Sequence, residues 1–183
     1  MDEASSRHRF ETMYRQTYEQ ILGYAMRRCS SPEDAADVVA ETYVIAWRRI
    51  AELPHGEAGR LWLYGVARRT LSNHRRGERR RATRHVELTS EVEVLYAPPS
   101  LQTGTDEAGE AMEMLSDDDR ELLALAFWEE LDPGEIAAVL GCSRNAARIR
   151  LHRARKRFAK ALEKTRRSMP RLEARPLIEK ESR

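Results

Sequence analysis

The chain has 183 residues, of which 41% are hydrophobic and 34% charged, with a formal net charge of +2. This composition is too apolar for general disorder, and the length allows one medium domain or two small ones. Cys29 and Cys142 are too few for a disulfide framework, and no CxxC motif or His/Cys cluster predicts a metal site. Without a signal-peptide core or a membrane-length apolar run, we expect a cytoplasmic protein that has no membrane anchor and no cofactor.

The small net charge is the sum of three strongly charged blocks of opposite sign. Residues 68–84 hold eight arginines and one acid, residues 106–135 twelve acids and one base, and residues 144–167 eleven bases and one acid. Two separated basic blocks indicate a polyanionic partner, most often nucleic acid, which is bound with release of counterions from phosphates. Either block taken alone is also compatible with a solvated helix face.

Residues 7–84 are interpreted as a first domain of four helices. Apolar side chains recur at helical spacing over 10–25. Ser31 and Pro32 have the properties of a helix start, and the pattern then continues to about residue 49. Proline and glycine predict a loop over 52–60, after which a helix resumes at 61–76. The inward side chains of the second and third of these helices are expected to be Ala35, Val38, Val39, Thr42, Ile45, Ala46, Leu63, Val66, Ala67 and Leu71.

A change of composition separates this domain from the rest of the chain. Residues 85–109 lose the apolar periodicity and contain clustered proline, serine and glycine, so a flexible linker is expected. A second helical domain is predicted at 110–167, followed by a polar tail at 168–183. The expected fold class is therefore all-α, with two small helical domains joined by a flexible linker.

The second domain contains a helix-turn-helix pattern. Asp132 followed by Pro133 predicts a capped helix start, and Gly141 predicts a left-handed residue that ends this short helix. Ser143 then caps a long basic helix that reaches about Thr165. A short helix, a glycine turn and a basic helix are the arrangement with which many proteins enter the DNA major groove.

The basic helix has an apolar stripe and an opposite face suited to DNA. Ala147, Leu151, Ala154 and Phe158 form the inward stripe. Arginine and asparagine on the outward side match the edges of guanine and adenine, and an isoleucine suits the thymine methyl group. Arginines nearer the flank suit phosphates, and we assign Arg150, Arg155 and Arg157 to this role. The candidate DNA-binding residues of this helix are Arg144, Asn145, Arg148, Ile149, Arg150, His152, Arg153 and Arg155.

Three motifs, in this order, resemble the extracytoplasmic-function group of sigma-70-type factors over about residues 10–162. The first, DAADVVAETY at 34–43 followed by AW at 46–47, resembles the family's helix that grips the clamp helices of the polymerase β′ subunit. The second, WLYGVAR at 62–68 with HRR at 74–76, is similar to the segment that melts and reads the −10 element. The third consists of EIA at 135–137, LG at 140–141, Ser143 and RLHRAR at 150–155, and it resembles the domain that reads the −35 element.

This resemblance assigns roles to particular residues, and the basic helix of the second domain becomes the −35 reader. The implied −10 contacts are Trp62, Arg68, Arg69, Asn73, Arg75 and Arg76. The implied polymerase contacts are Asp37, Ala40, Glu41, Val44 and Arg48, which share one outward helix face. Trp62 and Tyr64 beside the arginines suit single-stranded DNA, although at least one of these two aromatic residues is expected in the core.

The resemblance also implies partners beyond promoter DNA and the β′ clamp helices. The second domain would rest on the β flap, and the linker, with acids at Glu87, Glu91 and Glu93, would pass through the polymerase interior. In the family a base of the non-template strand is extruded into a pocket under the loop that corresponds to 52–60. Many members are held inactive by an anti-sigma factor wedged between the domains, which makes such a protein a candidate partner.

The sequence departs from the family pattern at several DNA contacts. Arg69 stands where asparagine is frequent, and Asn73 stands where aspartate is frequent, which leaves the −10 preference open. Residues 145–147 are Asn-Ala-Ala where Gly-Thr-Val is common, and this change removes a hydroxyl that could bind phosphate.

Two other classes of protein are alternatives. A dimeric helix-turn-helix regulator, with the first domain as sensor, would bind duplex operator DNA without polymerase. An enzyme is disfavoured because the five histidines are scattered and no phosphate loop or nucleophile elbow is present, so we expect a non-enzyme.

Overall fold

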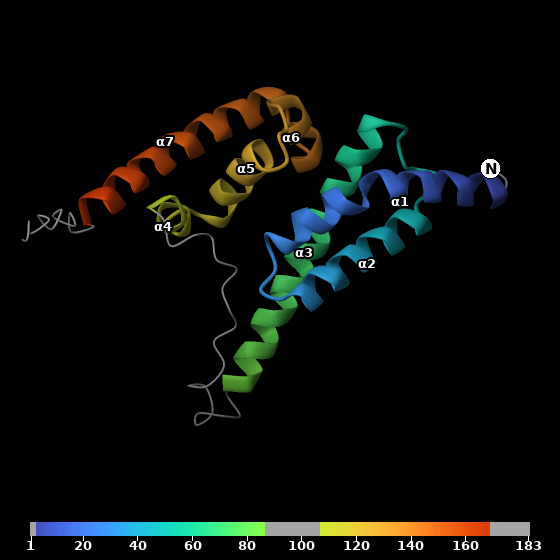
Figure 1. Ribbon diagram of the computed structural model, residues 1–183, viewed down its shortest axis with the longest axis horizontal. Helices are drawn as coiled ribbons and strands as arrows, with labels where there is room; N and C mark the ends of the chain where they lie inside the picture. Colours follow the sequence, from blue (N-terminus) through green and yellow to red (C-terminus); the bar gives the residue numbers. More distant parts are fainter. Residues whose placement is uncertain (1–2, 87–106, 169–183) are drawn as a thin grey trace, which may run out of the picture.

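The computed structural model describes residues 3–86 and 107–168, and every regular element in these two ranges is an α-helix. The expected all-α class with two small helical domains is confirmed (Figure 1). The first domain contains α1 (Glu3–Met26), α2 (Pro32–Arg48) and α3 (Glu57–Val86). The second contains α4 (Glu107–Glu113), α5 (Asp117–Phe127), α6 (Pro133–Leu140) and α7 (Arg144–Ser168). Residues 87–106, which hold most of the expected linker with Glu87, Glu91 and Glu93, and tail residues 169–183 lie outside the described residues.

The first domain differs from the expectation in the number and length of its helices. Residues 3–86 form three helices, not four, and α3 runs from Glu57 to Val86 instead of from 61 to 76. The expected loop over 52–60 is shorter because its second glycine belongs to the first turn of α3. Gly56 has a left-handed φ of 58°, whereas a Cβ on Gly59 would lie 2.6 Å from the Pro54 carbonyl oxygen. Gly59 is therefore required by a close approach of the chain rather than by a loop conformation.

The boundaries around the expected linker and tail also shift. The range 85–109 was expected to be linker, but α3 continues to Val86 and α4 already begins at Glu107. The last helix reaches Ser168 instead of ending at about Thr165.

Helix caps and inward stripes follow the sequence closely. The Ser31 hydroxyl accepts a hydrogen bond from the Asp34 amide at 3.1 Å, and the Ser116 hydroxyl accepts one from the Asp119 amide at 3.2 Å. All ten side chains expected inward on α2 and α3 are buried except Ile45, which is partly buried. Tyr43 of α2 is also buried, although it was not among the side chains expected inward. Its hydroxyl lies 2.9 Å from that of Thr17, and burial raises the pKa of Tyr43 to about 12.

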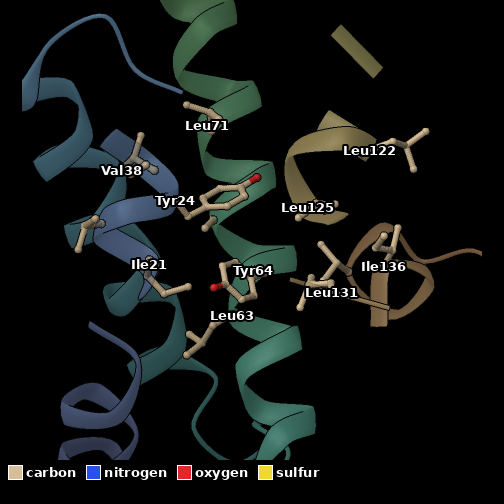
Figure 2. Packing of buried hydrophobic residues seen from close by; sticks show 14 of the residues in the cluster. Ile21, Tyr24, Val38, Leu63, Tyr64, Leu71, Leu122, Leu125, Leu131 and Ile136 are labelled. Carbon is tan, nitrogen blue, oxygen red and sulfur yellow. The ribbon is translucent and has the colours of Figure 1, made fainter. Parts of the chain in front are cut away.

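The two domains pack against each other. One continuous cluster of buried apolar residues includes Tyr24 and Tyr64 of the first domain and Leu125, Leu131 and Ile136 of the second. Figure 2 shows the two tyrosines between the helices of the first domain and these apolar residues, and their ring centroids are 5.4 Å apart. The domain contact brings α3 against α6 and leaves the outward face of α2 exposed, whereas Arg150 and Arg153 of α7 share a cavity with Arg68 of α3.

Candidate nucleic-acid interface

The helix-turn-helix is held by local hydrogen bonds at both ends of α6. The Asp132 carboxylate accepts hydrogen bonds from the amides of Glu135 and Gly134, at 2.9 and 2.5 Å, and these bonds lower the pKa of Asp132. The Glu135 carboxylate accepts in return from the Asp132 amide at 2.7 Å, which completes a capping box. Gly141 ends the helix with a φ of 66°, where a side chain is disfavoured. The amide of Cys142 also donates to the Ala137 carbonyl oxygen at 3.0 Å, so both ends of α6 are closed by bonds between neighbouring residues.

The helix α7 turns its apolar stripe inward and its polar face to solvent. Ala147, Leu151 and Ala154 are buried and Phe158 is partly buried, as expected. All eight residues expected to bind DNA on this helix are exposed, and Ile149 is 41% exposed although it is apolar. One of the Arg148 guanidinium nitrogens donates a hydrogen bond to the Asn145 side-chain oxygen at 3.2 Å, so these two neighbours present a joint polar surface.

Three arginines of α7, Arg150, Arg153 and Arg157, lie beside the acidic start of α5. Arg150 and Arg153 line a cavity of about 410 Å³ together with Asp118 and Asp119 at the start of α5. Arg157, which the sequence suggested as a phosphate contact, donates to both Asp119 carboxylate oxygens at 2.8 and 2.9 Å. Its guanidinium therefore has an intramolecular partner in this conformation.

The expected −10 residues of α3 lie on two faces. Trp62, Arg69, Asn73 and Arg76 are spaced by seven, four and three residues, which places them on one side of the helix. Arg69, Asn73 and Arg76 are exposed, whereas Trp62 is partly buried beneath the Arg49 guanidinium, 5.6 Å from its ring centroid.

A second side of α3 faces the other domain. Arg68 and Arg75 share this side, and both line a cavity of about 320 Å³ with Asp118 and Glu121 of α5. An Arg75 nitrogen also donates to the Arg28 carbonyl oxygen at 2.8 Å. Tyr64 is 2% exposed and belongs to the core, so it is not available to stack on a base.

A further cavity lies under the loop that precedes α3. Its volume is about 460 Å³, and His55 and Arg60 line it together with the α1 residues His8, Arg9 and Gln16. An Arg9 guanidinium nitrogen donates to the Leu53 carbonyl oxygen and so ties α1 to this loop. No local sequence pattern indicates these α1 residues, because tertiary packing alone brings them to this cavity.

The outward face of α2 is exposed along its whole length. Asp37, Ala40, Glu41, Val44 and Arg48 are all exposed, and Val44 is 46% exposed. Trp47, which belongs to the quoted motif, is 42% exposed at the edge of this face and packs on Phe10 with ring centroids 5.3 Å apart. A mixed acidic and apolar surface thus lies on the first domain, apart from the arginines of α3.

Other kinds of site find no support in the part of the chain that the structure describes. No group of three or more His, Cys, Asp or Glu side chains is placed there to hold a metal ion. Among the same residues, no helix combines the length and apolarity needed to cross a membrane.

Comparisons with known proteins agree with the two-domain arrangement. Residues 13–81 match the family model described as Sigma-70 region 2, and residues 105–158 match Sigma-70, region 4. The chain is 31% identical to the RNA polymerase sigma factor YlaC of Bacillus subtilis, over 85% of this chain and 93% of that protein. It is 26% identical to the ECF RNA polymerase sigma factor SigL of Mycobacterium tuberculosis, over 70% and 75% of the two chains.

The solved structures are similar in fold. The sigma factor RpoE in complex with the anti-sigma factor NepR, from Bartonella quintana, gives a TM-score of 0.63 at 22% identity, over 84% of this chain and 96% of that one. CnrH in complex with the cytosolic domain of CnrY gives a TM-score of 0.57 at 21% identity, over 85% and 88%. With both sigma-70 regions in order and a relative matched over nearly its whole length, the chain belongs to the sigma-70 family as an RNA polymerase sigma factor of the extracytoplasmic-function type.

Proposed function

We propose that this sigma factor distributes promoter recognition over three helices: α2 binds the β′ clamp helices of core RNA polymerase, α3 reads and melts the −10 element, and α7 reads the −35 element. The observation that carries the proposal is that all the residues assigned to α2 and α7 are exposed, although the same helices bury a continuous apolar stripe. Exposed arginines provide phosphate contacts on two separate domains, as binding to two promoter elements requires.

The −10 face of α3 suits a melted strand. Arg69, Asn73 and Arg76 offer donors to phosphates and base edges, and the exposed part of Trp62 offers a stacking surface. The cavity of about 460 Å³ under the loop before α3 falls in the size range of small-ligand pockets, and we assign it to an extruded base. Contacts in this cavity would offset the cost of unstacking that base.

The remaining assignments follow from the sigma-factor role. The second domain rests on the β flap, and residues 87–106 pass through the polymerase interior. The polymerase performs the chemistry, so this chain acts as a cytoplasmic, non-enzymatic subunit without a cofactor. An anti-sigma factor is a further candidate partner, because the Bartonella quintana sigma factor of similar fold was solved in complex with one.

A run-off transcription assay tests this proposed function. Core polymerase supplemented with the full chain should give discrete transcripts from a subset of genomic promoter fragments, and core alone should give none of them. If a stable complex with core forms but no promoter-dependent transcript appears on any fragment, the proposed function is wrong.

Two arginines of α7 should behave differently when replaced. Arg153→Ala is expected to weaken binding to the preferred −35 sequence by about 1–3 kcal/mol, roughly 5- to 150-fold, and to relax the preference at one base pair. Arg155→Ala should weaken all promoters about equally and reduce the salt dependence by about one counterion, since its partner would be a phosphate. Gel shifts of holoenzyme on promoter variants at several salt concentrations measure both effects. A uniform loss for both variants would show that the helix faces are wrongly assigned.

A further inference from the structure

The helix α5 packs against α7 and contacts an arginine of that helix at each of its own ends. Asp119 lies in the first turn of α5, and its carboxylate accepts hydrogen bonds from Arg157 at 2.8 and 2.9 Å. Phe127 is the last residue of α5, and its ring centroid lies 5.7 Å from the central guanidinium carbon of Arg155. Because the two arginines are two positions apart, their side chains leave α7 about 200° from each other.

The two partners on α5 differ in the charge that they leave available to a ligand. The Asp119 carboxylate has a side chain that is only 9% exposed, and it neutralises the guanidinium of Arg157 within the protein. The phenyl ring of Phe127 attracts a cation through its quadrupole but carries no net charge. Among the described residues Arg155 forms no ion pair with a carboxylate, so its positive charge is not neutralised there. A phosphate would therefore meet an unneutralised guanidinium at Arg155, whereas at Arg157 it would compete with Asp119.

Burial does not account for a phenylalanine at position 127. Phe127 is 60% exposed, the largest exposed fraction among the large apolar residues that the structure describes. A side chain that stays mostly in water gains little free energy from the hydrophobic effect. The neighbouring Trp128 is 47% exposed and has no cation–π contact with a described residue. The contact with Arg155 is thus what distinguishes Phe127 from an ordinary exposed aromatic residue.

We propose that Phe127 is a positioning residue for the DNA contact of Arg155, whose guanidinium its ring holds in place beside α7 before DNA binds. This role rests on the proposed assignment of Arg155 to a DNA phosphate. An arginine side chain has several rotatable bonds, and ordering it in a complex costs free energy. The ring removes part of this cost in advance, and the neutral ring leaves the full charge for the phosphate. Phe127 therefore raises the affinity for promoter DNA without reading its sequence.

Phe127→Leu removes the ring and retains an apolar side chain. Holoenzyme that contains this variant should bind promoter DNA roughly two- to tenfold more weakly, which is the cost of ordering one long side chain. The loss should be the same for every −35 sequence, since a phosphate contact carries no sequence information. The salt dependence should stay that of the wild type, because Arg155 still displaces a counterion when it reaches the phosphate. Arg155→Ala, in contrast, should lower both the affinity and the salt dependence.

A double-mutant cycle in gel shifts of holoenzyme, at several salt concentrations, tests this role. Wild type, Phe127→Leu, Arg155→Ala and the variant with both changes are compared on one promoter fragment. In the Arg155→Ala background, Phe127→Leu should cost no further affinity, because no guanidinium remains to be positioned. Phe127→Tyr retains the ring and should bind as the wild type does. Trp128→Leu is the matched control, since it removes the adjacent exposed aromatic side chain, and it should also leave DNA affinity unchanged.

The free full-length chain gives a second readout that does not involve promoter DNA. Nitrogen-15 relaxation of the Arg155 Nε–H group should show greater side-chain mobility in Phe127→Leu than in the wild type. The Nε–H group of Arg157, which Asp119 holds, should be equally mobile in both proteins and serves as the internal control. The Arg155 signal is identified by its absence from the spectrum of Arg155→Lys. Circular dichroism checks that each variant retains its helix content.

A weaker affinity of Phe127→Leu that disappears in the Arg155→Ala background, together with a more mobile Arg155, supports the positioning role. A loss that persists in the Arg155→Ala background, or an equal loss with Trp128→Leu, overturns it, because Phe127 would then act as an exposed apolar contact. Unchanged DNA affinity or unchanged Arg155 mobility in Phe127→Leu overturns it as well. If Arg155→Ala itself binds DNA as the wild type does, Arg155 contacts no phosphate and the role of Phe127 falls with it. If Arg155 becomes mobile as expected while the run-off assay yields no transcript, the proposed function fails, whereas the positioning of Arg155 by Phe127 is retained.

Discussion

Val44→Glu is expected to weaken the binding of this sigma factor to core RNA polymerase by roughly 30-fold, a loss of about 2 kcal/mol. Val44 lies in the middle of the exposed α2 face, with Ala40 and Arg48 one turn away on either side, and it is itself 46% exposed. A glutamate there would have to leave water at the interface without a partner, beside the carboxylate of Glu41. Because Val44 has no part in the core, the folded state should lose at most about 0.5 kcal/mol.

The matched control is Ala36→Glu on the same helix. Ala36 is also exposed, but it lies about a quarter turn from the centre of the α2 face. A titration of labelled full-length chain with core polymerase, followed by anisotropy, should show wild-type affinity for Ala36→Glu and the large loss for Val44→Glu. Equal affinities for the two variants would mean that the polymerase binds elsewhere on the chain.

Helix ends and helix faces could be predicted because they depend on neighbouring residues. Ser31 and Asp132 cap helices as expected, and Gly141 has the left-handed φ that the turn requires. Apolar spacing likewise separated the buried side of α7 from its exposed side, since side-chain direction in a helix follows from sequence position. These features cover the surfaces assigned to the polymerase and to the −35 element.

Features that join distant segments could not be predicted in this way. Gly59 suggested a loop, but its real requirement is the approach of the Pro54 carbonyl, which no local rule reveals. Arg28 and Glu129 lie 101 positions apart, and the sequence shows both charges without indicating that they pair. Arg68 was likewise assigned to DNA from its place in a basic block, and only the packing of the domains brings it against the acids of α5.

Alanine substitutions at Leu151 and Ile149 of α7 should have very different effects on stability, because one side chain is buried and the other is exposed. Leu151 is 3% exposed, and Leu151→Ala should cost about 2–5 kcal/mol through lost burial and the cavity left behind. The second domain has about 60 residues, for which a total stability of about 3–9 kcal/mol is typical, so this loss removes much of it. Ile149 is 41% exposed, and Ile149→Ala should change stability by less than about 0.5 kcal/mol. Denaturant unfolding followed by circular dichroism measures both values.

DNA binding by the same two variants tests whether the exposed face of α7 reads the −35 element. Selection of −35 sequences by holoenzyme from a randomised duplex pool should recover a changed base preference with Ile149→Ala, because an apolar contact with a thymine methyl group is lost. Leu151→Ala should instead reduce the yield of bound DNA without changing the sequence recovered, since an unfolded domain binds nothing and the folded fraction reads as before. Two outcomes would contradict these assignments. If Ile149→Ala destabilises the chain as much as Leu151→Ala, Ile149 belongs to the core. If the selected sequences are identical for wild type and Ile149→Ala, this side chain does not read the element. A changed preference at unchanged stability can arise only if the exposed side of α7 contacts the bases, because the substitution leaves everything that holds the helix in place.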